Sequence, residues 1–184
     1  MADRYATYKA WFEALPDADK ERTNSLIAQF KAVDAPTRQE WVRSEVSENL
    51  PQLAMYLLLH DVWVHIDAVV DEADMWIGDA LLPSANPDLP LFTDANRAIQ
   101  KMREAGLSQA DIVAVARLAA YNTAWGIVQS IDREQAFQAG EGAPGWRLME
   151  TNAAGELTGR DLGGLHESLL SLEEGRVAAG VVKE

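Results

Sequence analysis

The stretch PQLAMYLLLHDVWVHIDAVVDEADMWIGDALL, residues 51–82, decides the fold. Pro51 suits the first turn of a helix, where its missing N–H costs nothing. Apolar residues then recur at steps of three and four, which is the spacing of one helical face. The polar stripe on the opposite face consists of His60, Asp67, Asp71, Asp74 and Gly78. We therefore expect one long helix over 51–82, with a broad apolar face and a mostly acidic stripe.

The same helical spacing appears along most of the chain. Shorter helices are expected over residues 3–14, 17–33, 37–49 and 94–105. Gly106 follows the last of these at a position that commonly ends a helix. Before that helix, residues 83–93 hold three prolines, which predict an ordered, non-helical connection.

A second long helix is expected over residues 108–138. Ser108 and Asp111 resemble a capping box that opens it, with Asp in place of the usual Glu or Gln. A stripe of mostly small residues consists of Ile112, Ala116, Ala119, Thr123, Gly126 and Ser130. Small residues permit close approach of another helix, so we expect this stripe, including Gly126, to pack against the helix over 51–82.

The C-terminal part of the chain changes in composition. The segments WRLMET and ELTGR flank a turn-like NAAG at 152–155 and predict a short hairpin. A short helix over 164–173 and a loosely held tail follow. We therefore predict an all-α fold, a bundle of about six helices built on two long ones, with a small C-terminal β-hairpin and short helix. Residues 1–145 are expected to form the bundle domain, to which residues 146–184 are appended.

The composition is that of one globular domain. The chain has 184 residues, of which 48% are hydrophobic and 24% charged. It has no signal-peptide run and no uncharged apolar stretch of membrane-helix length, so we expect a soluble cytoplasmic protein. It has no cysteine, which excludes disulfides, thiol nucleophiles and Cys-ligated metals. A net charge of −13 argues against binding to nucleic-acid phosphates.

The negative charge is concentrated in one region. Residues 44–96 carry ten acidic side chains and neither Lys nor Arg, so they hold −10 of the net charge of −13. Such a region is either a solvated face or a surface that attracts a basic protein partner or a divalent cation. The residues expected to bind the partner are His60, Trp63, Asp67, Asp71 and Asp74. We predict a non-enzymatic protein without cofactor that binds a basic partner or self-associates into a homo-oligomer, with Trp63 at the contact.

An alternative function comes from LLLHDV at residues 57–62. This segment resembles the His-Asp dyad segment of the HD-domain phosphohydrolases, all-helical enzymes in which the dyad binds a divalent metal. The resemblance implies a metal at His60 and Asp61 and metal-dependent phosphohydrolase activity. It covers only these six residues. That family also places a metal-ligating His upstream of the dyad, whereas here no His precedes His60.

A third candidate site is the glycine-rich stretch GRDLGGLHES, residues 159–168. A glycine-rich turn that leads into a helix exposes N–H groups that favour an anion. The expected ligands are Arg160, Gly163, Gly164 and His166, with Arg160 able to make a bidentate contact. This stretch implies a small-anion or nucleotide-binding protein. The alternative is a simple chain turn in which Arg160 pairs with Asp161 or Glu167.

Overall fold

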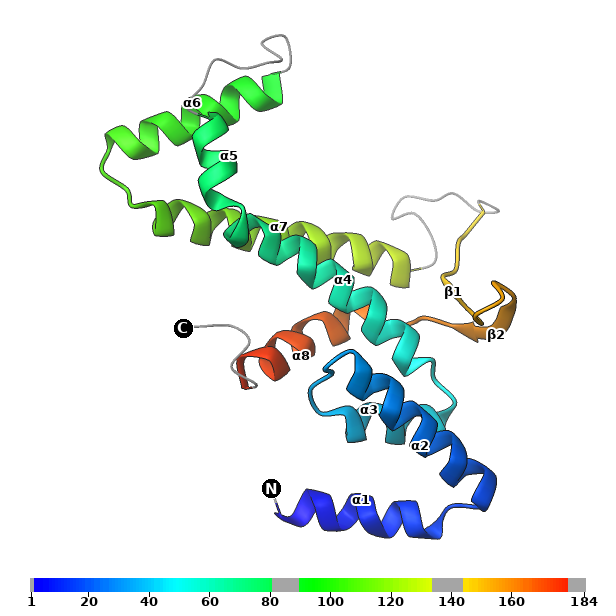
Figure 1. Ribbon diagram of the computed structural model, residues 1–184. Helices are drawn as coiled ribbons and strands as arrows, with labels where there is room; N and C mark the ends of the chain where they lie inside the picture. The colour runs from blue at the N-terminus through cyan, green and yellow to red at the C-terminus, as the bar shows by residue number, and fades with distance from the viewer. Residues whose placement is uncertain (1, 81–89, 134–143, 179–184) are drawn as a thin grey trace. The chain divides into compact units, whose positions relative to one another are not determined.

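The computed structural model describes residues 2–80, 90–133 and 144–178 (Figure 1). Over these residues the chain forms eight helices and one antiparallel two-stranded hairpin. In chain order they are α1 (Ala2–Ala14), α2 (Asp17–Ala32), α3 (Arg38–Glu48), α4 (Gln52–Asp71), α5 (Ala73–Ala80), α6 (Pro90–Glu104), α7 (Gln109–Asp132), β1 (Met149–Thr151), β2 (Leu157–Asp161) and α8 (Leu165–Ala178). The all-α fold with a small C-terminal hairpin and a following helix is confirmed.

The chain divides into two compact units. Unit 1 comprises Met1–His60 and Val128–Glu184, and unit 2 comprises Asp61–Ile127. The helices α4 and α7 each contribute to both units. The hairpin and α8 thus belong to the same unit as the N-terminal helices. The expected description, a bundle domain over residues 1–145 with residues 146–184 appended to it, remains a prediction.

The core of unit 1 is built from helices distant in sequence. Phe30 of α2 and Val42 of α3 are fully buried. Tyr56 of α4 packs its ring edge-on against Phe30 and Trp41, with ring centroids 5.7 Å and 6.0 Å apart. The apolar side of α8 is also buried, through Leu165, Leu169 and Leu172. This spacing of four and three residues is that of a single helical face.

The first turn of α8 is capped from α7. The Asp132 carboxylate accepts hydrogen bonds from the backbone N–H of Leu165 at 3.1 Å and of His166 at 2.8 Å. Its Oδ2 also lies 2.6 Å from Nδ1 of His166. A carboxylate at a helix N terminus satisfies N–H groups that have no partner within the helix. The α8 helix continues to Ala178, beyond the expected end at 173.

In unit 2 the second half of α4 lies beside α7 (Figure 1). The rings of Trp63 and Tyr121 are 5.7 Å apart, and Arg117 pairs with Asp67 at 3.3 Å. Later residues of α4 therefore meet earlier residues of α7, so the two helices run antiparallel. The expected pairing of the two long helices holds here.

The contacts between α7 and α4 described above do not come from the expected small-residue stripe, of which Ile112 is buried. The contacts with α4 are made by Arg117 and Tyr121, whereas Ala119 and Thr123 of the stripe are exposed. A Cβ added at Gly126 would meet no atom within 4 Å, so no close helix approach requires this glycine. The packing role expected for Gly126 is wrong.

The expected helix over 51–82 is broken at Glu72. The α4 helix ends at Asp71 and α5 begins at Ala73. In an unbroken helix the carbonyl of Val69 would accept from the N–H of Ala73. Here it accepts a hydrogen bond of 2.8 Å from the indole N–H of Trp76. The side chain of Trp76 in α5 thus stabilises the change of direction between α4 and α5. The apolar spacing of the sequence does not reveal this change.

The ends of α6 and α7 also differ from the expected ones. Pro90 begins α6, so residues 90–93 are helical rather than part of the proline-rich connection. Proline suits the first helical position because the N–H it lacks has no partner there. The rest of that connection lies outside the described residues. The α7 helix ends at Asp132, and the expected continuation over 134–138 also lies outside them.

Local signals at the α6–α7 connection are confirmed. Gly106 has φ of 85°, and its N–H and that of Leu107 donate to the carbonyls of Arg103 and Met102, both at 3.0 Å. This pattern ends a helix with a left-handed residue, which glycine adopts without steric cost. Ser108 and Asp111 form the expected reciprocal cap of α7.

Among the described helices, α4 is long and apolar enough by length and composition to cross a membrane. A helix packed inside a folded protein passes the same test. Of the apolar window of α4, 28% is buried within the chain, including Leu59, Trp63 and Ile66.

Candidate functional site

The acidic stripe of α4 and α5 is partly neutralised within unit 2. Asp67 and Arg117 form an ion pair at 3.3 Å, with both side chains about three-quarters buried. The guanidinium of Arg117 also lies over the ring of Trp63, 5.5 Å from its centroid. Asp67 is therefore committed to an internal contact between α4 and α7.

The other four residues expected to bind a partner are placed differently. Trp63 is only 2% exposed, so its ring fills the interior instead of offering surface to a second copy. Asp74 is exposed and accepts a hydrogen bond of 2.6 Å from Gln109, a neutral donor that leaves its charge in place. Asp71 and His60 are exposed.

The acidic run 44–96 is not one surface. Glu45 is buried in unit 1, where it belongs to a cluster of charged side chains described below. Asp94 pairs with Arg97 at 3.1 Å on α6. Exposed acids remain around the junction of α4 and α5, at Asp71, Glu72, Asp74 and Asp79.

Several apolar side chains of the same helices are also exposed, and the sequence did not single them out. They include Val64 of α4 and Val115, Leu118 and Trp125 of α7, with Val115 61% and Leu118 60% exposed. Counted at 100° per residue, Val64 lies about 60° around α4 from Asp67, and Leu118 about 100° around α7 from Arg117. Because the helices are antiparallel, both rotations lead to the same side of the pair.

We call this surface the α4–α7 face. It consists of Val64, Leu118 and Trp125, together with the exposed acids Asp61, Asp71 and Glu72. The helices α4, α5 and α7 contain one Lys or Arg, Arg117, which is paired with Asp67. The face therefore combines apolar surface with negative charge and has no exposed Lys or Arg from these helices.

The His-Asp dyad does not gather metal ligands in the described part of the chain. His60 and Asp61 are both exposed, and Asp61 lies 3.9 Å from the exposed His65 one turn later. Among the described residues, no three His, Asp or Glu side chains are placed to hold a metal ion. The HD-like activity remains an untested prediction.

The glycine-rich stretch forms the end of β2 and the start of α8. Gly164 has φ of 72°, which turns the chain into the helix. The N–H groups of Leu165 and His166 already bind an anion that the protein supplies, the Asp132 carboxylate. Arg160 pairs with Glu150 and Glu45, not with Asp161 or Glu167. The four expected anion ligands therefore do not converge on one open site.

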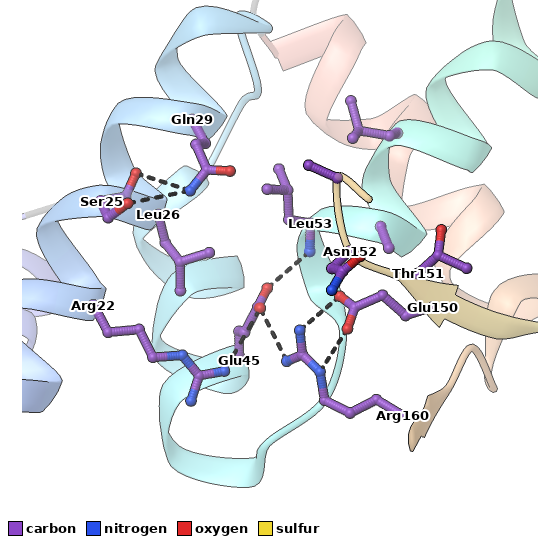
Figure 2. Close-up of a pocket in the computed structure, with 13 residues that line it drawn as sticks. Arg22, Ser25, Leu26, Gln29, Glu45, Leu53, Glu150, Thr151, Asn152 and Arg160 are labelled. Carbon is purple, nitrogen blue, oxygen red and sulfur yellow. Dashed lines mark hydrogen bonds and ion pairs between the residues drawn. The ribbon is translucent and has the colours of Figure 1, made fainter. Parts of the chain in front are cut away.

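Arg160 lies at the centre of a cluster of charged side chains in unit 1 (Figure 2). Its Nε and Nη2 donate to the two oxygens of Glu150 at 2.8 Å and 2.6 Å, a bidentate pair. Its Nη1 donates to Oε1 of Glu45 at 3.1 Å. Arg22 of α2 approaches the same Glu45 oxygen at 3.8 Å. The four charges sum to zero.

The cluster ties the hairpin to the helices. Glu45 of α3 also accepts the backbone N–H of Leu53 at 2.9 Å, so it caps the first turn of α4. Burial lowers the pKa of Arg160, but its hydrogen bonds and charge interactions with Glu150 and Glu45 outweigh that effect and leave the pKa raised. Arg160 therefore remains charged and fixes the hairpin against α3 and the start of α4.

A cleft of about 440 Å³ lies between α2 and the hairpin, next to this cluster (Figure 2). Arg22, Ser25 and Gln29 of α2 line one side, and residues 150–153 line the other. Leu26, Leu53, Ala54 and Leu57 add apolar surface. This volume is within the range of small-molecule sites, and the mixture of apolar and polar walls is typical of them.

The sequence contained no local signal for this cleft, because its walls come from three separate segments. Comparison of the chain with protein-family models, with curated proteins and with solved structures finds no match.

Proposed function

We propose that this protein binds a basic amphipathic helix of a protein partner on the α4–α7 face. The observation that carries the proposal is the juxtaposition of three exposed apolar side chains with exposed acids, and no exposed Lys or Arg on the same helices. A partner helix with one apolar stripe bordered by Lys or Arg would cover the apolar surface and meet the acids at its edges.

The charge of the face favours a basic partner over a second copy of the chain. Two copies that met through this face would bring Asp61, Asp71 and Glu72 of each near one another. Like charges at an interface cost free energy, and the chain already carries a net charge of −13. Self-association, which the sequence analysis also predicted, is therefore the less favoured mode here.

The buried residues of the acidic stripe have a supporting role in this proposal. The ion pair of Asp67 and Arg117 holds α4 and α7 together. Trp63 packs against both Arg117 and Tyr121 of α7. Helices that are held together by these contacts offer a surface that needs little reordering when a partner helix binds. Of the residues expected to bind a partner, Asp71 belongs to the α4–α7 face and Asp74 is exposed on α5. Asp67 and Trp63 instead hold together the two helices that form this face.

The test uses the full chain and a synthetic amphipathic peptide that carries Leu at every third or fourth position and Lys between. Binding is measured by fluorescence anisotropy. We expect the affinity to fall roughly tenfold in Leu118→Asp. The affinity of the wild type should also fall between about 0.1 M and about 0.5 M salt, because salt screens the attraction between the acids and the Lys side chains of the peptide. A peptide with Glu in place of Lys should not bind measurably.

Leu157→Asp is the matched control, because Leu157 is at least as exposed as Leu118 but lies on β2 in unit 1. It should leave the affinity unchanged. The proposal is overturned if Leu118→Asp binds the Lys peptide as well as the wild type does, or if Leu157→Asp weakens binding equally. Sedimentation of the protein alone decides whether it self-associates instead.

A further inference from the structure

We infer that the cleft between α2 and the hairpin is a second binding site, for a small ligand that joins a carboxylate to an apolar body. The inference is independent of the α4–α7 face, since all residues that line the cleft belong to unit 1.

The charge recognition rests on the different situations of the two arginines. Arg160 uses three nitrogen atoms to donate to Glu150 and Glu45, and so has little capacity for a ligand. Arg22 makes one ionic contact, 3.8 Å from Glu45, which is longer than a hydrogen bond. Its side chain is 39% exposed at the edge of the cleft. The guanidinium of Arg22 thus retains donors for an incoming anion.

Glu45 does not depend on Arg22. One of its oxygens accepts from Arg160 at 3.1 Å, and the other accepts from the backbone N–H of Leu53 at 2.9 Å. A ligand carboxylate could therefore form a bidentate pair with Arg22 without leaving Glu45 without a partner. The four charges of the cluster sum to zero, so a ligand carboxylate would bring the sum to −1. This extra charge would lie at Arg22, whose side chain is 39% exposed and where solvent screens it.

The apolar walls determine the rest of the ligand. Leu26, Leu53 and Leu57 lie along the cleft, and Leu57 is exposed. Covering such surface favours a ligand with an aliphatic body. Ser25 and Gln29 add exposed hydroxyl and amide groups on the wall formed by α2 (Figure 2). Neither the walls nor the volume would accommodate a large polyanion.

The site is preorganised. Glu45, Arg160 and Glu150 are mostly buried and fix the start of α4 against the hairpin, so two walls of the cleft are held before a ligand arrives. Asn152 is also fixed, because its Oδ1 accepts from the backbone N–H groups of Ala154 and Glu156 at 2.9 Å and 3.0 Å. Binding to a preformed cleft costs less ordering entropy than binding to a loose one.

The probes are acetyl-leucine and acetyl-leucinamide, which differ only in the carboxylate. Each is titrated into the ¹⁵N-labelled full chain, and backbone amide shifts are followed by NMR. We expect saturable shifts at cleft residues such as Ser25, Leu53 and Thr151. The acid should bind at least about tenfold more tightly than the amide, because it gains charge-assisted hydrogen bonds to Arg22.

Two variants and one control make the test decisive. Arg22→Gln should remove the preference for the acid while the spectrum stays that of a folded protein. Ala54→Trp should fill the cleft and abolish binding of both probes. Arg38→Gln, at an exposed arginine outside the cleft, should change nothing. The inference is overturned if acetyl-leucine causes no saturable shifts at the cleft, or if Arg22→Gln retains the preference of the wild type.

Discussion

Replacement of Arg160 by Met should destabilise unit 1 more than any other removal of one exposed or half-buried cation. The substitution keeps an aliphatic chain of similar length but removes the charge and every donor. Glu150 would lose both of its bonds to the guanidinium and keep the hydroxyl of Thr158 at 2.6 Å. Glu45 would keep the N–H of Leu53 and the more distant Arg22.

The magnitude follows from the burial of the two carboxylates. The side chain of Glu45 is 3% exposed, that of Glu150 is 10% exposed, and that of Arg160 is 20% exposed. Removing one partner of a buried ion pair typically costs about 3–5 kcal/mol. The contacts that remain place the expected loss near the lower end, at about 3 kcal/mol. With a urea dependence of about 2–3 kcal/mol/M, the midpoint should fall by about 1–1.5 M.

Urea unfolding followed by circular dichroism measures this loss, with Arg97→Met as the matched control. Arg97 and Asp94 form an exposed pair, with side chains 64% and 66% exposed, so that variant should lose at most about 1 kcal/mol. Adding Glu45→Gln and Glu150→Gln to Arg160→Met should restore part of the stability, because no unpaired charge is then left buried. A loss in Arg160→Met no larger than that of Arg97→Met would refute the reasoning.

Three further predictions concern helix stability, each measured as the free energy of unfolding in urea. Gly126→Ala should stabilise the protein by up to about 1 kcal/mol, because Gly126 is inside α7 and a Cβ there meets open space; a loss would show that the glycine is needed. Asp132→Ala should cost about 2 kcal/mol, since two N–H groups at the start of α8 lose their acceptor, and Asp132→Asn should recover part of it. Ser108→Ala should cost about 1 kcal/mol at neutral pH through loss of the cap of α7. Hydrogen bonds from Ser108 lower the pKa of Asp111, so the part of this loss that comes from the bond of the hydroxyl to the Asp111 carboxylate should be present above pH 3.8 and disappear as the pH falls through the lowered pKa. The part that comes from the N–H of Asp111 should remain; a loss that does not change with pH would contradict the role of the carboxylate.

The features that the sequence determined are those in which the interacting groups are near one another along the chain. Gly106 ends α6, and Ser108 and Asp111 cap α7 across three residues. The turn of the hairpin depends on Asn152, whose side chain accepts from residues two and four positions later. The apolar periodicity of residues 51–82 likewise identified most of the buried positions of α4 and α5, because one helical face is a local property.

Which partner each charged side chain contacts is decided by the tertiary structure alone. Arg160 finds Glu45 across 115 positions of the chain, and Arg117 finds Asp67 across 50. Because of these pairs, Asp67 is not available to a partner and Arg160 is not available to an anion. Trp63 is not available either, because it is buried. The acidic run could show how much negative charge was present, but not which carboxylates the fold would neutralise.

The exposed apolar residues of α7 and the cleft beside α2 have the same origin. Periodicity shows that a helix has an apolar side, but not which part of that side another element will cover. Leu118 and Trp125 are exposed because α4 contacts α7 through Tyr121 and Arg117. Local sequence thus set the helices, caps and turns, whereas packing between distant segments set the charged cluster, the cleft and the exposed face, because each of these exists only where separate segments meet.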